Sequence, residues 1–226
     1  MPSEHVENYL KNIYKLQEKE GKATTSSLSE KLQISAASVS EMIRKLAEEG
    51  SVRYTPYKGV ELTDEGRKRA LRIVRRHRLW ELFLVEVLKY DWDEIDEEAE
   101  RLEHITSEKL EERLDRALGY PQRDPHGDVI PSADGNLART DHVLLSAVKV
   151  GLSVVIERVS DANPGILQYA SKLGIALNKK IKIKERIEFD GSLRVELDGK
   201  DQFVSQKLAQ HIFVRMTGKS SGRKEL

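Results

Sequence analysis

Residues 4–50 place apolar side chains every three to four positions, which is typical of amphipathic helices. In residues 4–17 the apolar positions are Val6, Leu10, Ile13 and Leu16. The segments TTSSLSEKL (24–32) and SAASVSEMIRKLAEEG (35–50) repeat this spacing, and each opens on hydroxyl side chains that favour a helix N-cap. The last segment ends at Gly50, a residue type that commonly terminates helices. The pattern predicts three helices, with a short turn between the second and the third.

The pattern changes to alternation in SVRYTPYKGVELT (51–63), where Val52, Tyr54, Val60 and Leu62 are separated by polar residues. Alternation on both sides of a Pro-Tyr-Lys-Gly turn is typical of a short β-hairpin. Three helices followed by a two-stranded hairpin predict a winged helix-turn-helix.

Two long helices are predicted next. The first runs from Asp64 to about Lys89, with the Thr63 hydroxyl as its N-cap, and the second runs from about Asp93 to Leu118. Both are long enough to form the core of a dimer. The segment GYPQRDPHGDVIPSADGN (119–136) is rich in Pro and Gly, which predicts an irregular connector.

After Gly151 the chain becomes β-rich. The segments SVVIERV, KKIKIKERIEF, LRVELDG and QFVSQKLAQHIFVRM are separated by Gly, Asn and Asp, and their size suits a small SH3-like barrel. The final GKSSGRKEL is expected to be a frayed tail. We therefore predict a mostly α-helical protein with a β-rich C-terminal domain. Its expected parts are a winged helix-turn-helix domain (1–72), a helical dimerisation domain with the connector (73–140) and an SH3-like domain (151–226).

Composition narrows the function classes. The 226 residues are 38% hydrophobic and include no cysteine, which excludes disulfides and thiolate zinc sites. No apolar run approaches the ~20 residues that span a bilayer, so a soluble protein is expected. The absence of cysteine fits a reducing cytoplasm. The formal net charge is +0, but residues 66–78 are strongly basic and residues 90–100 strongly acidic. Segregated charge is compatible with both a phosphate-binding face and a cation-binding region.

The third predicted helix carries the features of a DNA-reading element. Its N-terminal residues are small, so the backbone can approach base edges, and basic and tyrosine side chains follow in positions suited to phosphates. The alternative is ordinary helix-cap chemistry on a solvated face. The candidate DNA-binding residues are Ser35, Ala36, Ala37, Ser38, Ser40, Arg44, Lys45, Tyr54, Tyr57 and Lys58.

The acidic region contains a candidate metal site. The spacing of Glu100, Glu103 and His104 aims two carboxylates and an imidazole at one point on a helix, although a solvated acidic helix would look the same. On the preceding helix, His77 and Glu81 interrupt an otherwise apolar stripe one turn apart. Imidazole and carboxylate groups pooled by two helices suit a divalent metal. The connector adds Asp124 and His126, for which turn chemistry is the simpler interpretation.

These motifs together resemble the diphtheria toxin repressor family of metal-dependent transcriptional repressors, which has iron-dependent and manganese-dependent branches. The resemblance extends over nearly the whole chain and includes a C-terminal domain similar to the family's SH3-like, or FeoA-like, domain. It implies a homodimer whose metal favours the DNA-binding arrangement. The motifs that carry it are YLKNIYKL, SAASVSEMIRKLAEEG, GVELTDEGR, RRHRLWELFL and EEAERLEH.

The resemblance also implies a ligand set. Glu100, Glu103 and His104 would be primary ligands, with His77 and Glu81 in another site or shared. The iron branch has cysteine at the position of Glu100, so a carboxylate there favours Mn²⁺, with Fe²⁺ as the alternative. Where the family has Met or Asp, this chain has Asn8, which can still bind through oxygen.

Two further features follow from the resemblance. Lys11 stands where the short manganese regulators have a second acid, so their two-metal arrangement is not expected to transfer intact. Asp124 and His126 resemble connector ligands of longer manganese regulators, and Asp161 would complete such a second site.

The expected function is therefore repression of metal-uptake genes through a palindromic DNA operator, with metal as corepressor and no enzymatic activity. An iron-selective repressor of the same family and a winged-helix regulator that senses a non-metal ligand remain as alternatives. A di-iron carboxylate enzyme would need two Glu-x-x-His motifs on different helices, and the predicted helices do not carry them. A third alternative is an adaptor that binds a protein partner through its SH3-like domain. That function would give no role to the basic recognition helix (35–50).

Overall fold

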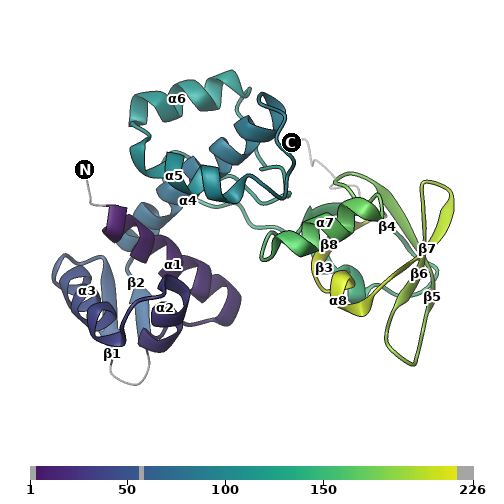
Figure 1. The fold of residues 1–226 in the computed structure, drawn as a ribbon, viewed down its shortest axis with the longest axis horizontal. Coiled ribbons are helices and arrows are strands. Elements are labelled where there is room, and N and C mark those ends of the chain that lie inside the picture. Colours follow the sequence, from purple (N-terminus) through teal and green to yellow (C-terminus); the bar gives the residue numbers. More distant parts are fainter. Residues whose placement is uncertain (1–3, 56–58, 218–226) are drawn as a thin grey trace, which may run out of the picture. The chain divides into compact units, whose positions relative to one another are not determined.

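The computed structural model describes residues 4–55 and 59–217. Two compact units make up the chain, and each is described by itself. The first unit contains Met1–Val87, Glu97–Gln122 and Val129–Ala138, and the second contains Leu88–Asp96, Arg123–Asp128 and Arg139–Leu226. Helices dominate the first unit and strands dominate the second, as Figure 1 shows. The prediction of a mostly helical protein with a β-rich C-terminal domain is confirmed.

The N-terminal segment forms the predicted helices and hairpin. Helices α1 (Glu4–Glu20), α2 (Thr25–Leu32) and α3 (Ala36–Glu48) are followed by the antiparallel strands β1 (Val52–Thr55) and β2 (Gly59–Leu62). The predicted hydroxyl caps are present: the side chain of Thr24 accepts a hydrogen bond from Ser27 N, and that of Ser35 accepts one from Ser38 N. Residues 56–58, which include the DNA-binding candidates Tyr57 and Lys58, lie outside the described residues.

One hydrophobic core joins α1, α2, α3, the hairpin and the first half of α4 (Asp64–Glu86). The apolar stripe of each helix points into it, because side chains three or four positions apart share a helix face. Gly66 allows α4 to pack closely on the hairpin, since a Cβ there would collide with the carbonyl oxygen of Ser51. The winged segment and α4 are therefore packed into one body.

The single helix predicted from about Asp93 to Leu118 is wrong. The structure has two helices instead, α5 (Asp96–Ile105) and α6 (Glu108–Ala117). Ser107 caps α6 by accepting a hydrogen bond from Leu110 N, and a serine used in this way competes with helix continuation. Because the chain turns at Ser107, α5 ends directly after the predicted metal ligands Glu103 and His104.

Arg75 attaches α4 to α6. Its guanidinium is buried and lies 2.9 Å from Glu111 Oε1 and 2.7 Å from Asp115 Oδ2, and it donates to the carbonyl oxygen of Pro131 at 2.8 Å. Three partners satisfy a buried cation that would otherwise be costly. This network therefore fixes α4 against α6.

The second unit contains a six-stranded antiparallel sheet with the strand order β3-β8-β4-β5-β6-β7. Its side chains alternate between a buried core and solvent, as expected for a sheet with one covered face. The strands are β3 (Val143–Leu144), β4 (Ser153–Val159), β5 (Lys180–Arg186), β6 (Leu193–Leu197), β7 (Lys200–Val204) and β8 (Ile212–Met216).

Helices interrupt the strands of this unit at three places. A short 3₁₀ helix, η1 (Leu145–Ala147), follows β3, and helix α7 (Pro164–Lys172), capped by Asn163, was not predicted. The last predicted β segment is split, because Ser205 caps a short helix, α8 (Gln206–Ala209), between β7 and β8. The predicted tail at 218–226 lies outside the described residues.

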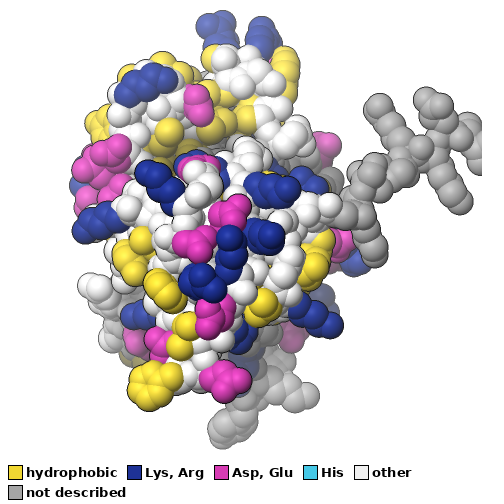
Figure 2. Space-filling model, turned by 90° about the vertical axis from the view of Figure 1, so that its right-hand side faces the viewer, with side chains coloured by type: hydrophobic (Ala, Val, Ile, Leu, Met, Phe, Trp, Pro, Cys, Tyr) yellow, Lys and Arg dark blue, Asp and Glu magenta, His cyan; other side chains and the backbone are white. Residues whose placement is uncertain are grey.

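The solvent face of the second unit is charged but mixed. Lys184 pairs with Glu196 at 2.6 Å, and Arg194 pairs with Glu185 at 2.9 Å, between neighbouring strands. Figure 2 shows a face on which basic and acidic side chains are intermixed with scattered apolar ones. Among the described residues, no helix is long and apolar enough to cross a membrane.

Candidate metal centre

Three helices of the first unit supply the metal candidates. Helix α1 presents Glu7, Asn8 and Lys11, helix α4 presents His77, and helix α5 presents Glu100, Glu103 and His104. Helical spacing puts the members contributed by each helix on one face, and packing brings the faces together. The side chains form two adjoining groups, with Glu103 common to both.

The first, called here the His77 group, consists of Lys11, His77, Glu100 and Glu103. Lys11 Nζ donates to Glu100 Oε2 at 2.6 Å and to Glu103 Oε1 and Oε2 at 2.8 and 2.6 Å. His77 Nδ1 lies 2.6 Å from Glu103 Oε2 and 3.2 Å from Lys11 Nζ. Lys11, His77 and Glu103 are buried, whereas the side chain of Glu100 is 40% exposed. One ammonium therefore contacts every other member of the group.

Glu103 is held in its charged form. Burial by itself would raise the pKa of this carboxyl group, but the hydrogen bond from His77 and the charge of Lys11 outweigh burial and lower the pKa below its ordinary value. A fully buried carboxylate that stays ionised is an available ligand for a cation.

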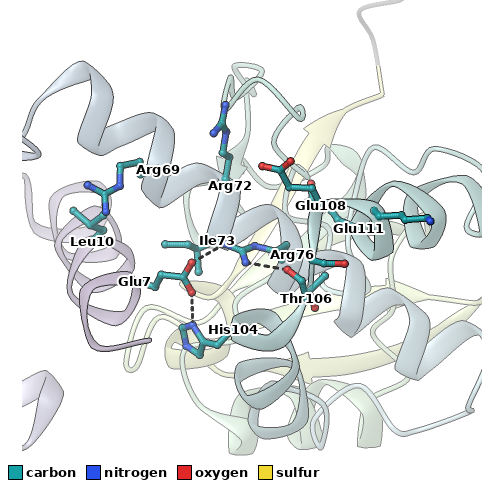
Figure 3. A pocket seen from close by; sticks show the side chains of 12 residues that line it. Glu7, Leu10, Arg69, Arg72, Ile73, Arg76, His104, Thr106, Glu108 and Glu111 are labelled. Atoms are coloured by element: carbon teal, nitrogen blue, oxygen red, sulfur yellow. Dashed lines mark hydrogen bonds and ion pairs between the residues drawn. The ribbon is translucent and has the colours of Figure 1, made fainter. Parts of the chain in front are cut away.

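The second, called here the His104 group, consists of Glu7, Asn8, Arg76 and His104 and shares Glu103 with the first group. His104 Nε2 lies 3.0 Å from Asn8 Oδ1 and 3.4 Å from Glu103 Oε1, and its Nδ1 lies 2.7 Å from Glu7 Oε2. Arg76 Nη2 donates to Glu7 Oε1 at 2.9 Å. Figure 3 shows Glu7 between the His104 ring and the Arg76 guanidinium. This arrangement turns Nε2 of His104 toward Asn8 and Glu103.

The His104 group fits a divalent metal. Neighbouring ligands of an octahedral ion at about 2.1 Å lie about 3 Å apart, close to the 3.0 and 3.4 Å found around His104 Nε2. The donors are an amide oxygen, a carboxylate oxygen and an imidazole nitrogen, a set that suits Mn²⁺ or Fe²⁺. Across both groups Lys11 and Arg76 oppose the carboxylates of Glu7, Glu100 and Glu103, so an excess of negative charge remains for a cation to balance.

The cavity drawn in Figure 3 lies beside the His104 group. It has a volume of about 470 Å³, and helices α1, α4 and α6 line it together with the end of α5. Arg69, Arg72 and Arg76 lie on its α4 side, and Glu7 and His104 reach it from α1 and α5. Solvent thus reaches the edge of the group.

The other predicted ligands are distributed differently. Glu81 is buried one turn after His77, with Oε1 3.4 Å from His77 Nε2. Asp124 and His126 are buried in the second unit, where Asp124 Oδ1 accepts hydrogen bonds from the backbone N–H groups of His126 and Asp128. His126 Nε2 lies 2.7 Å from the carbonyl oxygen of Trp92. Asp161 joins no group of three or more ligand-type side chains within 4–55 and 59–217.

Sequence reasoning missed Glu7 and Arg76 and did not assign Lys11 to a contact. A usable signal existed for two of them, because Glu7 and Lys11 are one helical turn apart among the buried positions of α1. A charged residue on a buried face needs a partner. The identity of that partner depended on how α1, α4 and α5 pack.

The candidate DNA-reading residues that the structure describes lie on an exposed surface. Side chains at the start of α3 are exposed, and the hydroxyls take part in local bonds: Ser35 Oγ lies 2.9 Å from Ser38 Oγ, and Ser40 Oγ donates to Ala36 O at 2.8 Å. Arg44, Lys45 and Tyr54 are also exposed. The face of α3 opposite the core is therefore open to a partner.

Family models match three consecutive parts of the chain. Residues 1–60 match the model described as iron dependent repressor, N-terminal DNA binding domain. Residues 63–132 match iron dependent repressor, metal binding and dimerisation domain. Residues 143–216 match the FeoA domain.

Individual proteins agree with these matches. The chain is 30% identical over 196 residues to the iron-dependent repressor IdeR of Mycobacterium tuberculosis, covering 79% of this chain and 83% of that protein. It is 27% identical over 217 residues to the diphtheria toxin repressor of Corynebacterium diphtheriae, covering 92% and 95%. A solved manganese-dependent transcriptional repressor in complex with manganese is 44% identical, with a TM-score of 0.87 over 93% of this chain and 99% of the other. The manganese regulator SloR is 36% identical, with a TM-score of 0.75 over 93% and 98%. The chain therefore belongs to the diphtheria toxin repressor family of metal-dependent transcriptional repressors.

Proposed function

We propose that Mn²⁺, with Fe²⁺ as the alternative, is the corepressor and that it binds at Asn8, Glu103 and His104, with Glu100 as a further carboxylate. The convergence of Asn8 Oδ1 and Glu103 Oε1 on His104 Nε2 is the observation that carries this proposal. A bound divalent ion would supply positive charge shared by α1 and α5. The similarity to manganese-dependent repressors supports the choice of metal.

The proposed mechanism depends on α1. This helix packs into the core of the winged segment, and it carries Asn8 at the metal centre. Ligands on α1 and α5 thus connect the DNA-binding segment to the helices matched by the dimerisation model. A metal that binds more tightly when these helices are correctly placed shifts the population toward that arrangement. A hundredfold change in operator affinity requires about 2.7 kcal/mol of coupling, a modest demand for several charged ligands.

The proposed DNA contacts come from a homodimer. Two copies of α3 would occupy half-sites of one palindromic operator, and the genes controlled would be those of metal uptake. The proposed place of action is the cytoplasm. The division into 1–72, 73–140 and 151–226 is retained as a proposal. So is a second metal position at Asp124, His126 and Asp161, which all belong to the second unit.

The direct test is operator binding by the full-length protein in a gel-shift assay, with a chelator and then with added Mn²⁺, Fe²⁺ or Zn²⁺. We expect Mn²⁺ to restore binding that the chelator removes, with roughly a hundredfold change in affinity. Binding that is the same under all conditions would contradict the proposal. Tight binding of Zn²⁺ would not identify the physiological ion, because Zn²⁺ exceeds Mn²⁺ in affinity at most sites of this kind.

Replacing Glu100 with Cys is expected to shift metal preference from Mn²⁺ toward Fe²⁺. A soft thiolate replaces a hard carboxylate, so the advantage of the ion that favours oxygen ligands falls. The measurement is the metal concentration that gives half-maximal operator binding, compared for the two ions under anaerobic conditions. A Glu100→Gln variant separates loss of charge from gain of sulfur, and an unchanged ratio in Glu100→Cys contradicts the argument from ligand hardness.

Replacing Arg44 with Ala is expected to weaken operator and nonspecific DNA binding to similar extents. Arg44 is exposed on α3, and a phosphate contact carries no sequence information. The slope of log affinity against log salt should fall by about one for each lost contact in a subunit. Lys172→Ala, which removes an exposed charge from α7, is the control and should leave the slope unchanged.

A further inference from the structure

Lys11 is a basic side chain at the centre of an acidic site. It is 1% exposed and is among the largest fully buried side chains of the described residues. Burying an ammonium group is unfavourable unless charged partners and hydrogen bonds compensate. Here three carboxylate oxygens lie within 2.8 Å of Nζ, and His77 Nδ1 lies at 3.2 Å. Four ligand-type atoms therefore surround the buried ammonium.

The side chains around Lys11 are of the types that bind metals. His77, Glu100 and Glu103 each offer one ligand atom, and these atoms lie within 4.8 Å of one another. Such a set, taken alone, could hold a divalent metal. The Lys11 ammonium contacts all three, so it fills the position between them.

We propose that Lys11 Nζ is a built-in cation that replaces a metal ion in the His77 group, so that the joined His77 and His104 groups hold one divalent ion per subunit. This inference rests on the proposed function for the position of that ion, beside His104. The new element is that the cation of the His77 group is the Lys11 ammonium and not a second metal ion.

A second consequence concerns the metal-free protein. Lys11 belongs to α1, whereas Glu100 and Glu103 belong to α5, so its ion pairs connect the two helices without metal. The metal at the His104 group would then add to an existing connection rather than create it. Substitution of Lys11 should therefore lower the stability of the metal-free protein more than that of the metal-bound protein.

Electron paramagnetic resonance of the wild-type full-length protein loaded with Mn²⁺ tests the first consequence. Two Mn²⁺ ions that share Glu103 would lie about 4 Å apart, as in two-metal sites, and would give an exchange-coupled spectrum. We expect no coupled pair in the wild-type protein. In Lys11→Glu, which converts the built-in cation to a ligand, we expect one more ion per subunit by equilibrium dialysis and a coupled spectrum.

Lys19→Glu is the matched control, because it makes the same charge change at an exposed position of α1 and should add no ion. Lys11→Leu removes the charge without adding a ligand atom, so its metal-free form should melt at lower temperature while added Mn²⁺ recovers part of the loss. If Lys11→Glu does not fold, the wild-type spectrum still decides the question. A coupled Mn²⁺ pair in a wild-type protein that represses overturns this inference alone. A wild-type protein that binds no Mn²⁺ overturns the proposed function and this inference with it.

Discussion

Replacing Glu103 with Gln is expected to abolish the metal response of operator binding, with a loss of at least about a hundredfold in the affinity gained on adding Mn²⁺. Glu103 is fully buried and contacts Lys11, His77 and His104. The variant removes the charge that balances these groups and replaces a carboxylate ligand of the proposed metal with a neutral, weaker amide oxygen. Gel-shift titration with Mn²⁺ measures the first effect.

The same variant should also be less stable without metal. Removing one partner of a buried ion pair leaves the other charge unpaired, at a cost of roughly 3–5 kcal/mol. Glu100 remains as a half-exposed partner of Lys11, so we expect the lower end of this range. Urea unfolding in the presence of a chelator gives the value.

Glu97→Gln is the control for both measurements. Glu97 lies on the same helix, its side chain is 83% exposed, and it pairs with Arg101 on the surface. This change should leave the metal response intact and alter stability by less than about 1 kcal/mol. A Glu103→Gln protein that still responds fully to Mn²⁺ would remove Glu103 from the proposed site.

Replacing Glu7 with Gln is expected to weaken Mn²⁺ binding by about 10- to 100-fold, although Glu7 is not proposed as a ligand. Its carboxylate lies 2.7 Å from His104 Nδ1 and 2.9 Å from Arg76 Nη2. A carboxylate at this nitrogen favours the tautomer with the proton on Nδ1, which leaves Nε2 for the metal. Loss of the charge makes the imidazole a weaker and less well oriented donor.

Isothermal titration with Mn²⁺ measures this effect, and Glu4→Gln is the matched control because Glu4 is exposed in the first turn of the same helix. The pH dependence of binding separates a positioning role from simple loss of packing. If Glu7 sets the protonated nitrogen of His104, the apparent affinity of Glu7→Gln should depend on pH differently from that of the wild-type protein. An unchanged affinity would assign Glu7 to helix packing alone.

The winged segment illustrates how much local pattern determines. Helical periods, hydroxyl caps at Thr24, Ser35 and Thr63, and alternation in the hairpin are all local properties of the chain. They predicted α1 to α4 and both wing strands close to their observed bounds. The break between α5 and α6 was missed because a hydrophobic period continues across Ser107, whereas the cap bond forms only in the folded backbone.

The sequence by itself determined the helical and β-rich halves, the exposed α3 and the residue types Glu100, Glu103, His104 and His77 of the metal centre. Only the tertiary structure decided which of these side chains meet. Packing of α1 against α4 and α5 divides them into two groups, brings Glu7 and Asn8 to His104, and inserts Lys11 among the acids. The physical reason is that helical period determines which residues share a face, whereas the partner across a helix interface depends on how the helices are placed against one another.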